Sequence, residues 1–178
     1  MKFQLNDIIT SRLALVAITP ESLWSERLGD GLLGTITNAH VPLEWPPEHW
    51  ELHVFELLIK RFGDDPTELG WHRYVALRHT DNSRTLIGTL GGFRKAERPE
   101  EFEVGYSVLK DFQRKGYATE GTKALIDWAL ARSSLKTISA QTFPSLPKSI
   151  RVMEKCGMKY VGAGDEEGSV RYQWQRFD

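Results

Sequence analysis

Hydrophobic residues recur along this chain with two spacings, and the spacing assigns most segments to a helix or to a strand. Helical spacing is clearest in residues 48–62 and 119–132. In the first segment the apolar residues on one face are Leu52, Phe55, Ile59 and Phe62, and Gly63 is expected to end the helix. In the second segment they are Ala124, Leu125, Trp128 and Ala129. We therefore predict two amphipathic helices.

Two shorter helices are predicted from the signals at their ends. Thr19 and Pro20 are a typical N-cap and first position for a helix over residues 21–28, which the segment 29–34 should interrupt. Gly157 is a typical C-terminal cap for a helix over residues 148–156. Three prolines between residues 41 and 47 predict a loop.

Short apolar runs separated by turn residues predict the strands. These runs cover residues 11–18, 71–78, 85–93, 101–108, 136–142, 158–163 and 170–177. Two consecutive strand–helix units in the middle of the chain favour a parallel pair at the centre of a mixed sheet. We thus predict one α/β (α+β) domain over residues 1–178, with about seven strands and about four helices. A ligand is expected at the carboxyl ends of the central strands.

Composition narrows the functional classes. Of 178 residues, 40% are hydrophobic and 26% charged, which is typical of a folded domain. The net charge of −1 argues against nucleic acid as a partner, and no segment has the length of a membrane span. Cys156 is the single cysteine, so an internal disulfide is excluded and a cytoplasmic setting is expected. The start of the chain shows no signal-peptide pattern.

The segment 113–118 lies between a predicted strand and a predicted helix, where an anion can bind. Gly116 lets the backbone approach a bulky anion, and Arg114 and Lys115 add positive charge. The glycine patterns of P-loops and of dinucleotide-binding folds are absent. From the residues alone, an ordinary strand-to-helix turn with surface charge is the alternative interpretation.

A family resemblance favours the anion site. The segment Gln113-Arg114-Lys115-Gly116-Tyr117-Ala118 resembles the Gln/Arg-x-x-Gly-x-Gly/Ala signature of the GNAT N-acetyltransferases. Three further segments resemble the RimJ/RimL-like branch, which acetylates ribosomal proteins: residues 9–15, 103–108 and 149–158. The resemblance implies a mixed, mostly antiparallel sheet whose parallel central pair is splayed to admit coenzyme A.

The resemblance also implies the donor and its contacts. Acetyl-CoA is the expected co-substrate, and its pyrophosphate would bind at the backbone of residues 114–118, with Gln113 opening the motif. The pantetheine arm would pair with the strand end near Val108, in a gap between the strands 101–108 and 136–142. Ser149 would lie near the sulfur of coenzyme A.

Catalytic residues are predicted from the same comparison and from the chemistry of acyl transfer. Glu103 is the candidate base; water is the alternative base, and alternation along the strand is equally consistent with a solvent-facing Glu103. Met153 occupies the slot where many acetyltransferases have a tyrosine acid, so Ser149 is the candidate acid. A simple N-cap role for Ser149 remains open. Leu146 replaces an asparagine that is usual in the branch.

Two aromatic residues are candidates for substrate binding. Trp45, in the proline-rich loop, is expected to roof the acceptor pocket, although it could instead pin the loop to the core. Tyr106 is a candidate for substrate binding or as the acid, although core packing also explains it. His49 and His53 form an i, i+4 pair but no further ligand completes a shell, so no metal is predicted.

The sequence therefore predicts an N-acetyltransferase that moves an acetyl group from acetyl-CoA to a primary amine by direct transfer in a ternary complex. The acceptor is a peptide or protein N-terminus or a small molecule, and the protein is a monomer or homodimer. A non-catalytic acyl-CoA-binding or sensing module is the first alternative. A structural interaction domain that uses the tryptophan-rich loop is the second.

Overall fold

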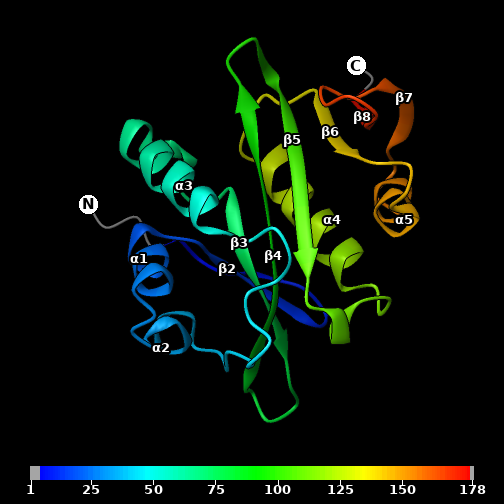
Figure 1. Cartoon of the computed structure of the whole chain (residues 1–178). Coiled ribbons are helices and arrows are strands. Elements are labelled where there is room, and N and C mark those ends of the chain that lie inside the picture. Colours follow the sequence, from blue (N-terminus) through cyan, green and yellow to red (C-terminus); the bar gives the residue numbers. More distant parts are fainter. Residues whose placement is uncertain (1–4, 177–178) are drawn as a thin grey trace.

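A central sheet of eight strands organises the protein in the computed structural model, which describes residues 5–176 (Figure 1). The strand order is β1-β2-β3-β4-β5-β6-β8-β7. The strands are β1 (Ile8–Ile9), β2 (Leu13–Ala17), β3 (His72–Arg78), β4 (Arg84–Lys95), β5 (Arg98–Val108), β6 (Thr137–Thr142), β7 (Lys159–Ala163) and β8 (Val170–Gln175).

The parallel pair in the middle of the sheet positions the site. All neighbouring strands run antiparallel except β5 and β6. Their parallel pairing extends from Glu101–Thr137 to Glu103–Ser139. Beyond that point β5 continues to Val108 and β6 to Thr142 without pairing with each other, while β5 stays paired with β4 and β6 with β8. The predicted mixed sheet with one parallel pair is confirmed, and the strands part beyond Glu103.

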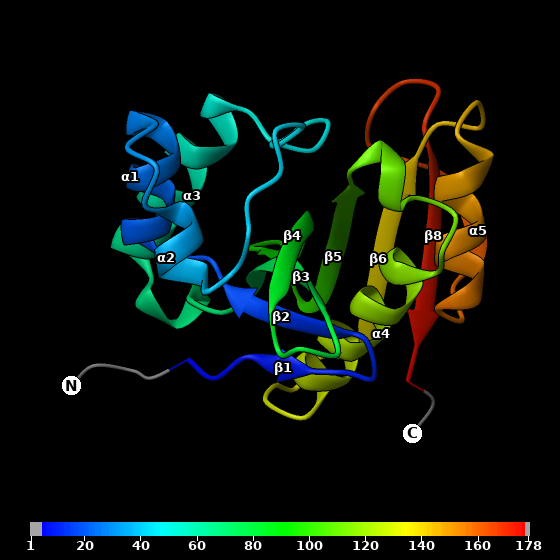
Figure 2. The same cartoon turned by 90° about the horizontal axis from the view of Figure 1, so that it is seen from below.

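In the part of the chain that the structure describes, five α-helices lie in two layers on the sheet (Figures 1 and 2). Helices α1 (Pro20–Leu28), α2 (Leu33–Thr37) and α3 (Leu52–Asp64) pack on the face that carries Tyr74 and Leu86. Helices α4 (Tyr117–Leu130) and α5 (Pro147–Lys155) pack on the opposite face, beside Phe102 and Ile138. Two 3₁₀ turns, Pro66–Glu68 and Lys110–Phe112, complete the elements.

The structure departs from the sequence-based expectation around the first helices. A short helix, α2, begins at Leu33, inside the segment expected to interrupt the chain, and the two-residue strand β1 was not predicted. Helix α3 begins at Leu52 rather than at residue 48 and continues past Gly63 to Asp64. Trp50 is only 6% exposed because its ring packs on Phe55 and Tyr74, so the residues before α3 follow the core instead of a helical path.

Two expectations fall partly outside the described residues. Phe177, the predicted end of the last strand, is one of them. The other is the absence of a signal-peptide pattern, which rests in part on residues 1–4. Within residues 5–176, no helix is long and apolar enough to cross a membrane.

Candidate active site

Residues 113–118, the predicted anion site and called the cradle from here on, lie where β5 passes through the 3₁₀ turn Lys110–Phe112 into α4. Arg114 and Gly116 have φ angles of 61° and 85°, so the backbone turns sharply through left-handed conformations just before the helix. Gly116 is the N-cap of α4, and no side chain caps the first N–H groups of this helix. These N–H groups and the positive end of the helix dipole are therefore available to an anion.

An arginine from another part of the chain supports the cradle. Arg12, in the turn before β2, donates from Nη1 to the carbonyl of Lys115 (3.0 Å) and lies over the ring of Tyr117, 4.6 Å from its centroid. Its Nε pairs with Glu120 Oε2 at 2.7 Å. Sequence reasoning did not identify Arg12 or Glu120, because they are distant along the chain and no motif spacing relates them.

Glu120 connects the turn before β2 to the first turn of α4. Its carboxylate accepts hydrogen bonds from the hydroxyl of Thr10 (2.6 Å), the hydroxyl of Ser11 (3.0 Å) and the backbone N–H of Arg12 (2.9 Å). Partial burial opposes ionisation of Glu120, but these hydrogen bonds outweigh it and lower its pKa to about 2. An ionised carboxylate, that of Glu120, thus connects the start of α4 to the turn before β2.

Val108 and Gln113 meet at the end of β5. The side-chain amide of Gln113 donates to the carbonyl of Val108 at 2.9 Å. This bond ties the first residue of the motif back to the strand end, which is the predicted place for the pantetheine arm. The carboxyl end of β5 and the amino end of α4 are thereby held at a fixed spacing.

Glu103 lies on the face of β5 that is shared with Phe93, the face on which α1–α3 pack further along the sheet. Its side chain is 25% exposed and accepts a hydrogen bond from Gln141 Nε2 at 2.9 Å. Oε2 also lies 3.3 Å from both Lys95 Nζ and Arg171 Nη2. The carboxylate is therefore half-buried, and its charge is balanced by two cations.

Arg171, in β8, is the centre of this charged cluster. It is 6% exposed and pairs with Glu101, Glu103 and Asp165. Burial disfavours the charge of Arg171, but these carboxylates outweigh it and raise its pKa. Since its Nε has no hydrogen-bond partner, one polar atom of the cluster is unsatisfied.

Ser149 and Tyr106 meet on the opposite face of the sheet. The Tyr106 hydroxyl donates to the carbonyl of Ser149 at 2.9 Å and lies 3.2 Å from its Oγ. Burial raises the pKa of Tyr106 to about 12, so this hydroxyl is protonated at neutral pH. Met153, in the slot where the family often has tyrosine, is 1% exposed and packs in the core.

The structure thus brings Ser149 to Tyr106, but places Glu103 and Trp45 across the sheet from them. Cys156 Sγ points at the carbonyl of Thr119 (3.9 Å), and burial raises the pKa of this thiol to about 11. Such a thiol is a poor nucleophile.

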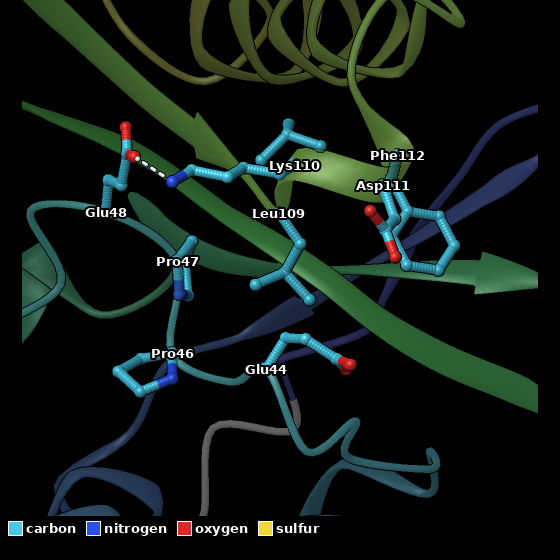
Figure 3. A pocket seen from close by; sticks show the side chains of 9 residues that line it. Glu44, Pro46, Pro47, Glu48, Leu109, Lys110, Asp111 and Phe112 are labelled. Carbon is cyan, nitrogen blue, oxygen red and sulfur yellow. Dashed lines mark ion pairs between the residues drawn. The ribbon is translucent and has the colours of Figure 1, made fainter.

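The loop between α2 and α3 extends over the carboxyl end of β5. A cavity of about 370 Å³ separates loop residues 44 and 46–48 from residues 108–112 (Figure 3). Lys110 and Glu48 face each other across it, with Nζ and Oε1 3.3 Å apart. This cavity lies beside the predicted position of the pantetheine arm.

Trp45 is anchored on the far side of that loop. Its Nε1 donates to Glu26 Oε2 at 2.9 Å, and its ring lies 6.0 Å from the ring of Tyr74. Trp50 Nε1 and the Tyr74 hydroxyl also donate to Glu26. Sequence reasoning missed Glu26, because its position in α1 gave no sign that three aromatic donors converge on it.

Metal ligands do not gather in the described residues. Across residues 5–176, no group of three or more histidine, cysteine, aspartate or glutamate side chains is arranged to hold a metal ion. His53 Nδ1 lies 3.5 Å from Glu51, and both side chains are exposed.

Comparison with known families identifies the chain. The protein-family model described as the acetyltransferase (GNAT) domain matches residues 30–159 of this chain. An uncharacterized N-acetyltransferase of Bacillus subtilis, YjdG, is 29% identical over 128 residues, which cover 70% of each chain. The FsC-acetyl coenzyme A-N(2)-transacetylase of Aspergillus fumigatus is 30% identical over 118 residues, or 61% of this chain and 46% of that protein.

Solved structures share the fold at low sequence identity. An acetyltransferase from Agrobacterium tumefaciens superposes with a TM-score of 0.64 at 18% identity, over 99% of this chain and 98% of that chain. A structure described as a ribosomal-protein-serine acetyltransferase from Vibrio cholerae gives a TM-score of 0.61 at 18% identity, over 96% and 97% of the two chains.

Proposed function

This chain belongs to the GNAT acetyltransferase family and is an N-acetyltransferase, and we propose that it transfers an acetyl group from acetyl-CoA to a primary amine by direct attack in a ternary complex. The observation that carries the proposal is the uncapped N-terminus of α4 behind Arg114 and Gly116, at the end of a strand that parts from its parallel neighbour. An anion-binding helix end beside an open strand edge matches a ligand with both a pyrophosphate and an amide-bearing arm.

In this proposal, acetyl-CoA binds along the open edge of β5. The backbone N–H groups of residues 114–118 hold the pyrophosphate, and the strand end near Val108 receives the pantetheine arm. Gln113 acts through its bond to the Val108 carbonyl, which keeps the two parts of the cradle together. Acetyl-CoA supplies the activated acyl group.

The transfer requires two proton movements. The acceptor nitrogen loses a proton, forms the new N–C bond and expels the coenzyme A thiolate, which then takes up a proton. We assign Glu103, directly or through water, to the first step, because it is the predicted carboxylate on the acceptor side. Its carboxylate lies 3.3 Å from both Lys95 Nζ and Arg171 Nη2, which hold the side chain in place.

Ser149 is assigned to the second proton movement. Its hydroxyl oxygen lies 3.2 Å from the Tyr106 hydroxyl, which donates its proton to the backbone carbonyl of Ser149. Tyr106 is thereby proposed to orient Ser149 and to contribute to the lining of the acyl site. Trp45, on the other side of the sheet, is proposed to shape the acceptor pocket.

Membership of the RimJ/RimL-like branch, with a peptide or protein N-terminus as one acceptor class, remains part of the proposal. The similar structure from Vibrio cholerae supports it at the level of fold. We further propose that the protein is cytoplasmic, because a single cysteine suits a reducing compartment. We also propose that it is a monomer or a homodimer.

Calorimetric titration with acetyl-CoA and with coenzyme A, followed by a thiol-release assay over amines and N-terminal peptides, tests the function. Binding with thiol release on an acceptor supports the transferase. Binding without release on any acceptor of the panel favours the sensing module, and absence of binding contradicts the cradle.

A further inference from the structure

We propose that the acceptor is an amine with a second positive charge, and that this second charge binds between α1, α3 and the loop before α3. This inference rests on the proposed acetyl transfer and names the class of its acceptor. The site is the tryptophan pocket, defined here by Glu26, Trp45, Trp50, Glu51 and Phe55. It would hold an ammonium group while a second amine of the same molecule reaches the acetyl group.

The tryptophan pocket is large enough for an alkyl ammonium. Its volume is about 580 Å³. The remaining lining residues are Ser25, Gly29, Gly31, Leu33, Val41, Pro46 and Leu52. Two carboxylates and no lysine, arginine or histidine line this cavity, so its charge favours a cation over an anion.

Glu26 supplies a negative charge without a counter-ion. Its oxygens accept hydrogen bonds from Trp45 Nε1 (2.9 Å), Trp50 Nε1 (3.0 Å) and the Tyr74 hydroxyl, all of them neutral donors. Among the ion pairs between residues 5 and 176, none includes Glu26. A half-buried carboxylate in this state gains most from a cation that a ligand brings.

Burial raises the pKa of Glu26 above its ordinary value, and the hydrogen bonds from Tyr74, Trp45 and Trp50 offset this only in part. An ammonium placed beside the carboxylate would offset the cost of burying its charge. Other buried carboxylates of this protein already have such a partner, as Glu101 does in Arg171.

Aromatic rings line the pocket beside Glu26, and a cation that reaches one of their faces would gain a further attraction. Trp50 lies 5.2 Å from Phe55 and 6.3 Å from Tyr74 between ring centroids, and Trp45 lies 6.0 Å from Tyr74. Indole faces attract ammonium groups more strongly than other aromatic side chains do. The alkyl chain of a ligand would lie against the apolar wall at Leu33, Val41 and Leu52.

The sheet register links the pocket to the open edge of β5. Tyr74 pairs with Thr89, which pairs with Ser107, so these residues lie in one row across β3, β4 and β5. Two strand spacings separate Tyr74 from Ser107 by about 10 Å. Pro46 lines both the tryptophan pocket and the cavity beside Val108. An acceptor whose nitrogens are several bonds apart can therefore reach from Glu26 toward β5.

The test compares 1,5-diaminopentane with n-hexylamine, which match in length and differ in the second charge. In the thiol-release assay at saturating acetyl-CoA, we expect kcat/KM to be about tenfold or more higher for the diamine. Glu26→Gln should bring the ratio toward one, mainly through a higher KM for the diamine. Equal kcat/KM for the two amines in the unmodified protein overturns the proposal.

Matched variants separate charge from structure. Tyr74→Phe removes one hydrogen bond to Glu26 but keeps its charge, and Glu56→Gln removes a carboxylate of α3 that faces Arg27 outside the pocket. Both should keep the diamine preference. If Tyr74→Phe abolishes it as fully as Glu26→Gln does, Glu26 is only a structural anchor and the proposal fails. Should Glu26→Gln not fold, Trp45→Leu must lower the preference.

Failure of the proposed function is distinguishable from failure of this inference. If acetyl-CoA does not bind, the transferase proposal fails, and the pocket is judged by titrating the protein with the two amines and following tryptophan fluorescence. Tighter binding of the diamine, weakened by Glu26→Gln, retains the cation site. Equal or absent binding overturns it.

Discussion

Gly116 shows at the scale of one residue why the cradle needs glycine. Its φ of 85° strains any other residue, and a Cβ atom would lie 3.3 Å from Arg12 Nη2. We predict that Gly116→Val lowers acetyl-CoA affinity by about a hundredfold or more, since the side chain obstructs the N–H groups of α4. Calorimetric titration measures this. Gly63→Val, in α3 where a Cβ atom meets nothing within 4 Å, should leave the affinity unchanged.

Glu103 is the proposed general base for the acceptor amine. If it is the base, Glu103→Gln should lower kcat by about a hundredfold or more at pH values below the pKa of the amine. The pH–rate profile of kcat measures this. Asp165→Asn, which removes another carboxylate paired with Lys95 and Arg171, is the control and should have a much smaller effect. An unaltered profile in Glu103→Gln would leave water as the base.

Contacts between elements stabilise the cradle, and the bond network of Glu120 joins the turn before β2 to α4. Because the pKa of Glu120 falls from its usual 4.5 to about 2, its contribution is complete above about pH 4.5 and is lost as the pH falls toward 2. Glu120→Gln should lower the free energy of unfolding by about 1–2 kcal/mol at pH 7 and flatten its decline at acidic pH. Urea denaturation between pH 7 and 3 measures both. Glu97→Gln, in the exposed turn between β4 and β5, should change neither.

Tyr106 of β5 contacts Ser149 of α5, the proposed acid. Ser149→Ala should lower kcat at least about tenfold while acetyl-CoA still binds, if Ser149 Oγ protonates the thiolate. Tyr106→Phe should lower kcat less, because it removes the bond to Ser149 and keeps the ring in the core. Single-turnover kinetics with separate binding measurements checks this. An unchanged kcat in Ser149→Ala would make this serine part of the helix start only.

At the scale of the whole molecule, the sheet consists of two halves that meet only where β5 and β6 pair. A ligand in the gap beyond Glu103 should join these halves. At a hundred times its dissociation constant, acetyl-CoA should stabilise the fold by about 2.7 kcal/mol, which corresponds to a rise in Tm of about 5–10 °C. Thermal unfolding with and without acetyl-CoA measures the shift, and no shift would contradict binding to the folded state.

Most of the fold followed from the hydrophobic pattern. The runs that predicted strands 71–78 and 101–108 became β3 and β5, and the stripe over residues 119–132 became α4. The errors cluster in residues 29–51, where Trp50 packs into the core and determines the path of the backbone. Periodicity carries no information about such a contact, because the partner residue Tyr74 belongs to a strand much later in the chain.

The backbone turn before α4 lies where the sequence predicts it, but the contacts that support this turn were not predicted. Local sequence could locate Gly116, because a backbone turn before a helix is encoded by neighbouring residues. Arg12 and Glu120 lie more than a hundred positions apart, so only the folded sheet brings them together. The same holds for Glu26, whose three aromatic donors come from the loop and from β3.

By itself, the sequence determined the kind of structure at most segments outside residues 29–51, the mixed sheet with one parallel pair, and the helix end that suits an anion. These are local properties, set by the spacing of apolar residues and by glycine and proline. Only the tertiary structure decided which charges meet: the ion pairs of Glu103, the contact of Ser149 with Tyr106, and the carboxylate of Glu26 among aromatic rings. Such pairings depend on strand register and helix packing, which arise from the burial of the whole core at once.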